Sequence, residues 1–194
     1  VAEDFIKHYE TRVAEGATVA GKAMFVCSNR NIAYDFYKIV KELRPEWTEK
    51  KICDDGVVLS EKDKKELKPM EKIKLVMTRN KDDEKDLFDM LGTKEDRKEF
   101  DRQFKNPKSN FKIAIVVDMW LTGFDVPELD TIYIDKPIQQ HTLIQTISRV
   151  NRVCEGKDKG LIVDYIGIKK NMNTALKKYT NFESEEFEGV EQSI

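Results

Sequence analysis

The residues best suited to phosphate chemistry lie in one short segment, QTISRVNR at 145–152. The chain has eight arginines against 26 lysines, yet Arg149 and Arg152 stand three residues apart, with Gln145 four residues before Arg149. On a helix these three positions share one face. Because a guanidinium is always charged and its planar fork matches phosphate oxygens, the arginines could clamp a phosphoryl group during its transfer. A solvated or salt-bridged helix face is the alternative, and spacing alone favours it.

Further candidates follow predicted strands, where open α/β sheets bind their ligands. Ser28, Asn29 and Arg30 follow one predicted strand, and DMWLTGFDVP at 118–127 follows another. The backbone amides after the first strand suit a phosphate, but Ser28 and Asn29 are also ordinary helix caps. TGFD at 122–125 likewise suits an Asx-type turn ahead of a proline.

A sheet must position these segments, and five stretches have the composition of its strands. They are short, apolar and rich in β-branched residues, as strands buried on both faces of a parallel sheet must be. They span 22–28, 72–78, 111–118, 129–135 and 159–165. Helical patterns alternate with the strands, which predicts an α/β fold, a parallel sheet with helices on both faces.

The helical patterns are stripes of apolar residues at helical spacing. The leading stripe is Phe5, Tyr9 and Val13; later stripes are Ile32, Phe36, Ile39, Val40 and Leu43, then Leu143, Ile147 and Val150. A closing stripe consists of Met172, Ala175, Leu176 and Tyr179. The acidic residues after Phe182 have no basic neighbours, so we expect that end to be frayed or to join another domain.

Charge is balanced over the whole chain, with 34 basic against 36 acidic residues and a net charge of −2. This excludes a basic nucleic-acid-binding tail or an acidic disordered tail as the whole protein. Residues 61–110 hold 28 charged side chains, yet Leu87 and Leu91, then Phe100 and Phe104, have i, i+4 spacing. We therefore expect two amphipathic helices in this segment, divided by a glycine stop and a threonine cap at Gly92 and Thr93.

The three cysteines are Cys27, Cys53 and Cys154, and they have no spacing typical of zinc ligands or of a disulfide framework. A reducing cytoplasm fits this pattern, and the sequence predicts no metal site. The longest apolar runs have five residues, far short of the roughly 20 that span a bilayer, so no membrane partner is expected.

Three segments together are specific enough to indicate a family. DMWLTGFDVPELDTIYIDKP, HTLIQTISRVNRV and GKDKGLIVDYIG closely resemble the second RecA-like motor lobe of superfamily 2 helicases and translocases. Within that group the chain is most similar to the restriction (R) subunit of type I restriction-modification enzymes. The resemblance implies a RecA-like lobe at 21–168 with a charged helical insert at 61–110, a lead-in helix at 1–20, and a closing helix and acidic tail at 169–194.

The resemblance also implies roles for particular residues. Its motif VI pattern matches Gln145, Arg149 and Arg152, with the two arginines as arginine fingers. Ser148 stands where many superfamily 2 members have a glycine.

The family's motif V matches the turn TGFD. Thr122 resembles a contact to a nucleic-acid phosphate, Gly123 provides a tight turn, and Asp125 resembles the residue that reaches toward the nucleotide and couples the two sites. Motif IV and the following strand end imply further DNA contacts at Ser28, Asn29, Arg30, Thr78 and Arg79.

The sequence has no GxxxxGK[ST] loop and no DExx pair after a strand. By the resemblance, ATP and Mg²⁺ would be bound mainly by a first motor lobe of the same parent chain, and this chain alone would be inactive. The implied partners are double-stranded DNA, the first lobe and a nuclease domain of the same chain, and the methyltransferase and specificity subunits. The alternatives are a lobe of another superfamily 2 motor, or a non-catalytic RecA-like module that binds nucleic acid or protein.

Overall fold

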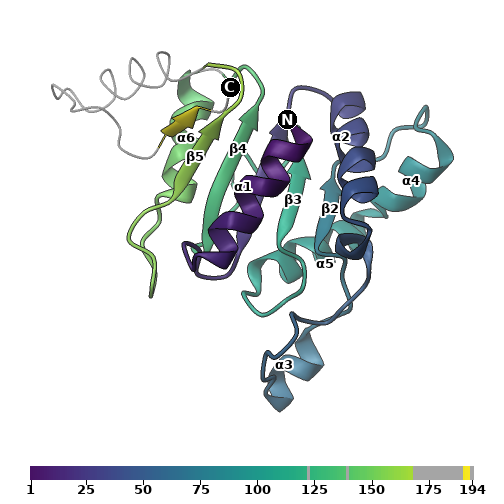
Figure 1. Cartoon of the computed structure of the whole chain (residues 1–194). Helices are drawn as coiled ribbons and strands as arrows, with labels where there is room; N and C mark the ends of the chain where they lie inside the picture. The colour runs from purple at the N-terminus through teal and green to yellow at the C-terminus, as the bar shows by residue number, and fades with distance from the viewer. Residues whose placement is uncertain (122, 139, 168–189, 193–194) are drawn as a thin grey trace, which may run out of the picture.

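A computed structural model describes residues 1–121, 123–138, 140–167 and 190–192 as one α/β layer structure (Figure 1). Its sheet contains six strands in the order β2-β3-β1-β4-β5-β6, and every neighbouring pair is parallel. The strands are β1 (Lys22–Cys27), β2 (Ile73–Val76), β3 (Ile113–Val116), β4 (Leu129–Asp135), β5 (Leu161–Asp164) and β6 (Val190–Gln192). The prediction of an α/β parallel sheet is confirmed, and all five predicted strands form within their expected ranges.

The helices cover both faces of this sheet. They are α1 (Ala2–Ala14), α2 (Arg30–Leu43), the 3₁₀ turn η1 (Pro45–Thr48), α3 (Glu61–Glu66), α4 (Lys85–Leu91), α5 (Lys94–Lys105) and α6 (Gln140–Val150). In Figure 1, α1 and α2 lie in front of the sheet, α6 lies behind it, and α3 extends below the edge where the strands begin. The arrangement leaves the carboxyl ends of the strands together at the opposite edge.

Two hydrophobic cores follow from the alternation of side chains along each strand. Phe25 of β1 faces the core under α1 and α2, where Phe5 packs edge-on against Phe25 and Tyr133 with ring centroids 5.2 and 4.7 Å apart. The neighbouring Met24 and Val26 face the core that contains α5 and α6. Every residue of β1 is buried, and after Lys22 its sequence is apolar on both faces.

The segment between α3 and β3 contains the two helices that the i, i+4 pairs predict. Thr93 caps α5: its hydroxyl accepts from the Asp96 backbone N–H, and the Asp96 carboxylate accepts from the Thr93 backbone N–H. Gly92 ends α4 with a φ of +64°, and a Cβ there would lie 2.7 Å from the Cβ of Asp96. The close approach explains why glycine occupies the junction.

The predicted apolar stripe on α2 is partly wrong. Phe36 and Val40 are buried, but Ile32, Ile39 and Leu43 are exposed by 40%, 46% and 37%. The buried face consists instead of Ala33, Phe36, Tyr37 and Val40. These four positions follow the 3–4 spacing of a single helix face, and the other apolar residues lie beside it. Val13 is likewise exposed, although it continues the Phe5 and Tyr9 stripe of α1.

The tail contributes a strand that its acidic composition did not predict. Val190–Gln192 forms β6, which pairs in parallel with β5 at Ile162, Val163 and Asp164. The closing helix expected around Met172 to Tyr179 lies outside the described residues. The division of the chain into a lead-in helix at 1–20, a lobe at 21–168 and a closing segment at 169–194 stays a prediction. Among the residues described, no helix is long and apolar enough to cross a membrane.

Candidate functional site

The loop between β3 and β4 meets the end of α6 in a hollow of about 490 Å³. The residues that line it are Gly123, Phe124, Asp125, Ser148, Arg149 and Arg152. Four of the residues predicted to handle nucleotide, from two segments more than 20 positions apart, therefore share one cavity. It lies toward the amino edge of the sheet, because α6 ends against Gly160, the residue directly before β5.

Arg149 is the more firmly held of the two arginines. It lies in the last turn of α6, which is anchored by the buried Leu143, Ile147 and Val150. Its Nε donates a hydrogen bond to the backbone carbonyl of Leu121, 2.9 Å away. Burial lowers the pKa of Arg149 from its ordinary value, but a guanidinium stays charged at any physiological pH.

The end of α6 is also held from the β5 side. A Cβ at Gly160 would collide with the backbone carbonyl of Val150, so only glycine allows this close approach. The backbone N–H of Gly160 donates to the side chain of Asn151 at 3.3 Å. These contacts restrict the position of the helix end that carries Arg149.

Arg152 lies beyond the end of α6 and is held only at the surface. One of its terminal nitrogens lies 2.6 Å from the Asp125 carboxylate, and both side chains are about half exposed, at 52% and 53%. An exposed pair of this kind contributes little free energy, so Arg152 can exchange Asp125 for another anion at small cost.

Gln145 does not join the arginines. Its amide lies 3.0 Å from the ring nitrogen Nε2 of His141, one turn earlier on α6, and it is not among the described residues that line the hollow. Gln145 and Arg149 both lie on α6, one turn apart, whereas Arg152 lies beyond the end of the helix at Val150, so the three residues do not form one continuous helix face.

An aromatic stack supports the loop, and its role was not predicted from the sequence. The rings of Trp120 and Phe124 are stacked, with centroids 4.1 Å apart and an interplanar angle of 3°, and Phe104 of α5 lies 5.3 Å from Trp120. Trp120 has a φ of +67°. Tryptophan and phenylalanine in a loop suggest burial, but nothing in their spacing indicates this backbone conformation.

The side chains expected to contact DNA after β1 have structural partners within the fold. The Ser28 hydroxyl donates to the backbone carbonyl of Asp135 at 2.6 Å, and this contact joins the ends of β1 and β4. Asn29 caps α2, since its side-chain oxygen accepts from the backbone N–H of Ile32 at 3.0 Å. The capping alternative therefore holds for Asn29.

Arg30 and Thr78 meet at the carboxyl ends of β1 and β2. Arg30 donates to the Thr78 carbonyl and to the Asp83 carboxylate, both at 2.6 Å. Both residues line a hollow of about 160 Å³, together with Asp118 after β3. Arg79 does not join Arg30 and Thr78. Its Nε donates to the Phe88 carbonyl at 2.7 Å, and its guanidinium lies 4.3 Å from the centroid of the Phe88 ring.

Thr122 lies outside the described residues. Among the residues that are described, no group of three or more His, Cys, Asp or Glu side chains could hold a metal ion.

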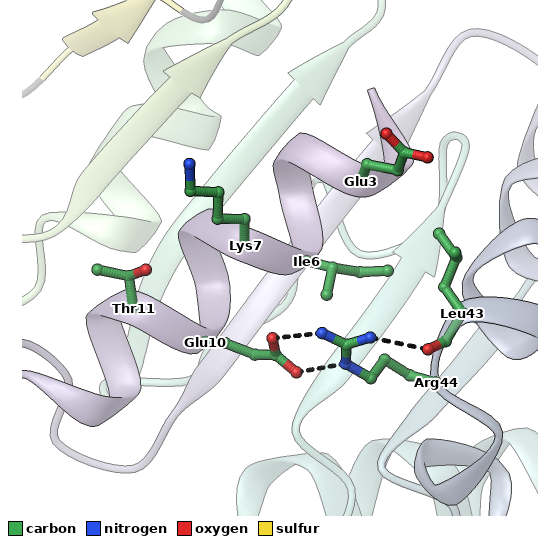
Figure 2. A pocket seen from close by; sticks show the side chains of 7 residues that line it. All are labelled: Glu3, Ile6, Lys7, Glu10, Thr11, Leu43 and Arg44. Carbon is green, nitrogen blue, oxygen red and sulfur yellow. Dashed lines mark hydrogen bonds and ion pairs between the residues drawn. The ribbon is translucent and has the colours of Figure 1, made fainter.

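A separate hollow of about 310 Å³ lies between α1 and the end of α2 (Figure 2). Figure 2 shows Arg44 spanning the gap to the Glu10 carboxylate, with N–O distances of 2.6 and 2.8 Å. The hydrogen bond from Arg44 lowers the pKa of Glu10. None of the predicted site residues lines this hollow, and the bidentate pair joins α1 to the rest of the fold.

Comparisons with known proteins agree with this architecture. The family model "Type I restriction enzyme subunit R domain 3" matches residues 19–167. The chain is 39% identical over 184 residues to a type I restriction enzyme HindI endonuclease subunit of Haemophilus influenzae. That alignment covers 93% of this chain but only 16% of the relative, so the chain spans about a sixth of that protein's length.

Solved structures match the fold at low sequence identity. A fragment of an HsdR subunit of a type I restriction enzyme from Vibrio vulnificus YJ016 has a TM-score of 0.59 at 14% identity, covering 98% of this chain and 31% of that chain. Mss116p bound to ssRNA and AMP-PNP has a TM-score of 0.57 at 15% identity, covering 100% of this chain and 30% of that chain. The fold is that of a RecA-like second lobe of DEAD-box helicases.

Proposed function

The chain belongs to the type I restriction enzyme subunit R domain 3 family, and from this premise we propose that it is the second motor lobe of an ATP-driven DNA translocase. One observation carries the proposal: Arg149 and Arg152 converge with Gly123 and Asp125 on one hollow. Two guanidinium groups in one cavity form a site for an anion with several oxygens, such as a terminal phosphate.

The residues of the hollow suit a triphosphate in three ways. Arg149 would stabilise the charge that develops on the phosphoryl group, because it is tethered at Nε and so needs little reorganisation. Arg152 would exchange its ion pair with Asp125 for one with the phosphate. The loss of that ion pair would couple nucleotide binding to the β3–β4 loop, which carries Asp125. A Cβ at Gly123 would meet no atom within 4 Å, so its backbone is open to a ligand.

ATP supplies the phosphoryl group whose transfer to water drives the motor. We propose that Mg²⁺ and the β-phosphate are held by a first lobe of the same parent chain, and Arg149 and Arg152 then complete the site from across the cleft. Gln145 pairs with His141 outside the hollow, and we propose that it contacts the nucleotide only when the first lobe is present. Closing and opening of the two lobes would follow binding and hydrolysis.

Double-stranded DNA would run along the carboxyl ends of the strands. Arg30 and Thr78 bring polar and cationic atoms together there, and Ser28 and Asn29 follow the same strand as Arg30. Thr122, from the same loop as Gly123, and Arg79 complete the proposed track. In the whole protein, a nuclease domain of the same chain would cut the DNA, and the methyltransferase and specificity subunits would select the site.

The test is the ATPase rate of the full-length parent carrying Arg149→Ala or Arg152→Ala. We expect each change to lower turnover by roughly 10³-fold or more, as loss of an arginine finger does. Arg102→Ala is the matched control, because Arg102 pairs only with Glu99 on α5 among the described residues and lies in neither candidate hollow. Turnover within about threefold of wild type in both finger variants would contradict the proposal and favour a non-catalytic binding module.

A further inference from the structure

Trp120 has an unusual backbone conformation in the β3–β4 loop, three residues before Gly123 of the candidate nucleotide site. Among the described residues it is the only one other than glycine with a positive φ, at +67°. A bulky residue rarely adopts this left-handed conformation, and it persists only where surrounding contacts enforce it. Such outliers are concentrated at functional sites.

The contacts that enforce the conformation come from the aromatic side chains around Trp120. Trp120 is only 9% exposed, and its ring lies parallel to the Phe124 ring, with centroids 4.1 Å apart. Phe104 and Phe111 hold it from α5 and from the segment before β3, at 5.3 and 6.4 Å. Trp120 and Phe124 therefore pack on each other and against the core behind the sheet.

The consequence of the turn appears at the next residue. The carbonyl of Leu121 points at α6 and accepts the hydrogen bond from Nε of Arg149 at 2.9 Å. Leu121 is only 3% exposed, so the residue that carries this carbonyl has little room to move. Among the described residues, Arg149 makes no other hydrogen bond, so its two terminal nitrogens are left for a ligand.

We propose that Trp120 is a positioning residue for Arg149. Its left-handed turn and its stack on Phe124 hold the Leu121 carbonyl, and that carbonyl sets the plane of the guanidinium toward the hollow. The inference rests on the proposed function, in which Arg149 acts on the transferred phosphoryl group. Trp120 itself lines no part of the hollow and would act only through Leu121.

Three substitutions separate the contributions of the ring and the backbone. Trp120→Phe keeps an aromatic ring for the stack and should keep the turn. Trp120→Ala removes the ring and leaves a side chain that disfavours positive φ, so the turn should relax and rotate the Leu121 carbonyl away. Trp120→Gly also removes the ring but tolerates positive φ, so its effect should be intermediate.

The measurement is steady-state ATPase activity of the full-length parent with saturating DNA. We expect Trp120→Ala to lower kcat about tenfold, because small misplacements of a catalytic group cost up to about 10²-fold. KM for ATP should change less than about twofold, since the arginine acts in the transition state more than in binding. Trp120→Phe should restore kcat to within about twofold of wild type.

A double-mutant cycle with Arg149→Lys distinguishes positioning from general loosening of the fold. Lysine keeps the charge but has no Nε–H to meet the Leu121 carbonyl, so Trp120→Ala should cost little further in that background. Phe36→Leu is the control: it removes a ring from the core on the other face of the sheet, away from Trp120, and should lower the melting temperature without lowering kcat.

Two results would overturn the role of Trp120 but not the proposed function. They are equal losses of kcat from Trp120→Ala in the wild-type and Arg149→Lys backgrounds, or no loss of kcat in either background. Near-normal turnover of Arg149→Ala would overturn the proposed function and the inference with it. That outcome is read from the arginine variant alone, so the two failures are distinguishable.

Discussion

Arg149 and Arg152 have similar chemistry but opposite degrees of restraint. Arg149 is partly buried, and its Nε is engaged by a backbone carbonyl, whereas Arg152 is half exposed and pairs with a carboxylate. A restrained cation suits stabilisation of a transition state, and a loosely paired one suits capture and release of an anion. We infer that the two proposed arginine fingers are not interchangeable.

The exposure of the Arg152 pair leads to a prediction about stability. Asp125→Asn should change the free energy of unfolding by less than about 1 kcal/mol, because both partners are well solvated. Asp83→Asn is the contrasting variant: Asp83 is 6% exposed and accepts hydrogen bonds from Arg30 and from the backbone N–H of Asn80. Its loss should cost about 2 kcal/mol.

Urea unfolding of the three proteins measures both values. Equal costs for Asp125→Asn and Asp83→Asn would show that Arg152 is held as tightly as Arg30. The proposed exchange of Asp125 for phosphate would then be too costly.

At the scale of single elements, the short helix α3 depends on a capping carboxylate. Asp63 accepts from Lys108 at 2.6 Å and from the backbone N–H and hydroxyl of Ser60, both at 2.8 Å. The hydrogen bond from Lys108, followed by those from Ser60, lowers the pKa of Asp63 to about 2. The contact ties the segment before β3 to a helix that otherwise extends from the sheet (Figure 1).

This pKa shift sets the direction of a pH effect. The folded pKa lies below the ordinary value of 3.8, so the contact stabilises the fold above about pH 4 and is lost as the pH falls toward 2. Asp63→Asn should therefore remove part of the fall in melting temperature between about pH 5 and about pH 2. Asp35→Asn is the control, because the Asp35 pair with Lys38 is well exposed and should contribute little to stability. Identical pH profiles of wild type and Asp63→Asn would contradict this role.

At the scale of the whole molecule, the chain would offer one side of the proposed ATP site. It has two arginines in one hollow but no GxxxxGK[ST] loop. We expect the isolated 194-residue chain to show no measurable ATPase activity. We also expect weak DNA binding whose affinity falls steeply with salt, because it depends on a few phosphate contacts.

Turnover assays and DNA-binding titrations at several salt concentrations test this expectation. Robust ATP hydrolysis by the isolated chain would contradict the half-site model. Binding that is insensitive to salt would argue against the phosphate contacts proposed around Arg30 and Thr78.

Much of the fold was predictable because its signal is local. The runs at 111–118 and 129–135 are apolar on both faces, and only a strand buried between two helix layers needs such a composition. Thr93 and Asp96 likewise predict the start of α5 from three-residue spacing. Where two faces of one helix compete for the core, as on α2, the pattern was insufficient, and Ile32 and Ile39 proved to be exposed.

By itself, the sequence determined the parallel sheet, its helical layers and the segments that bear Gly123, Asp125, Arg149 and Arg152. These follow from hydrophobic period and residue type, which each segment carries alone. Only the tertiary structure decided that Gln145 stays apart and that β6 joins the sheet. It also decided that Trp120 adopts a left-handed turn whose next carbonyl holds Arg149. These features depend on contacts between distant segments and on backbone conformations that packing imposes, and no local pattern encodes either.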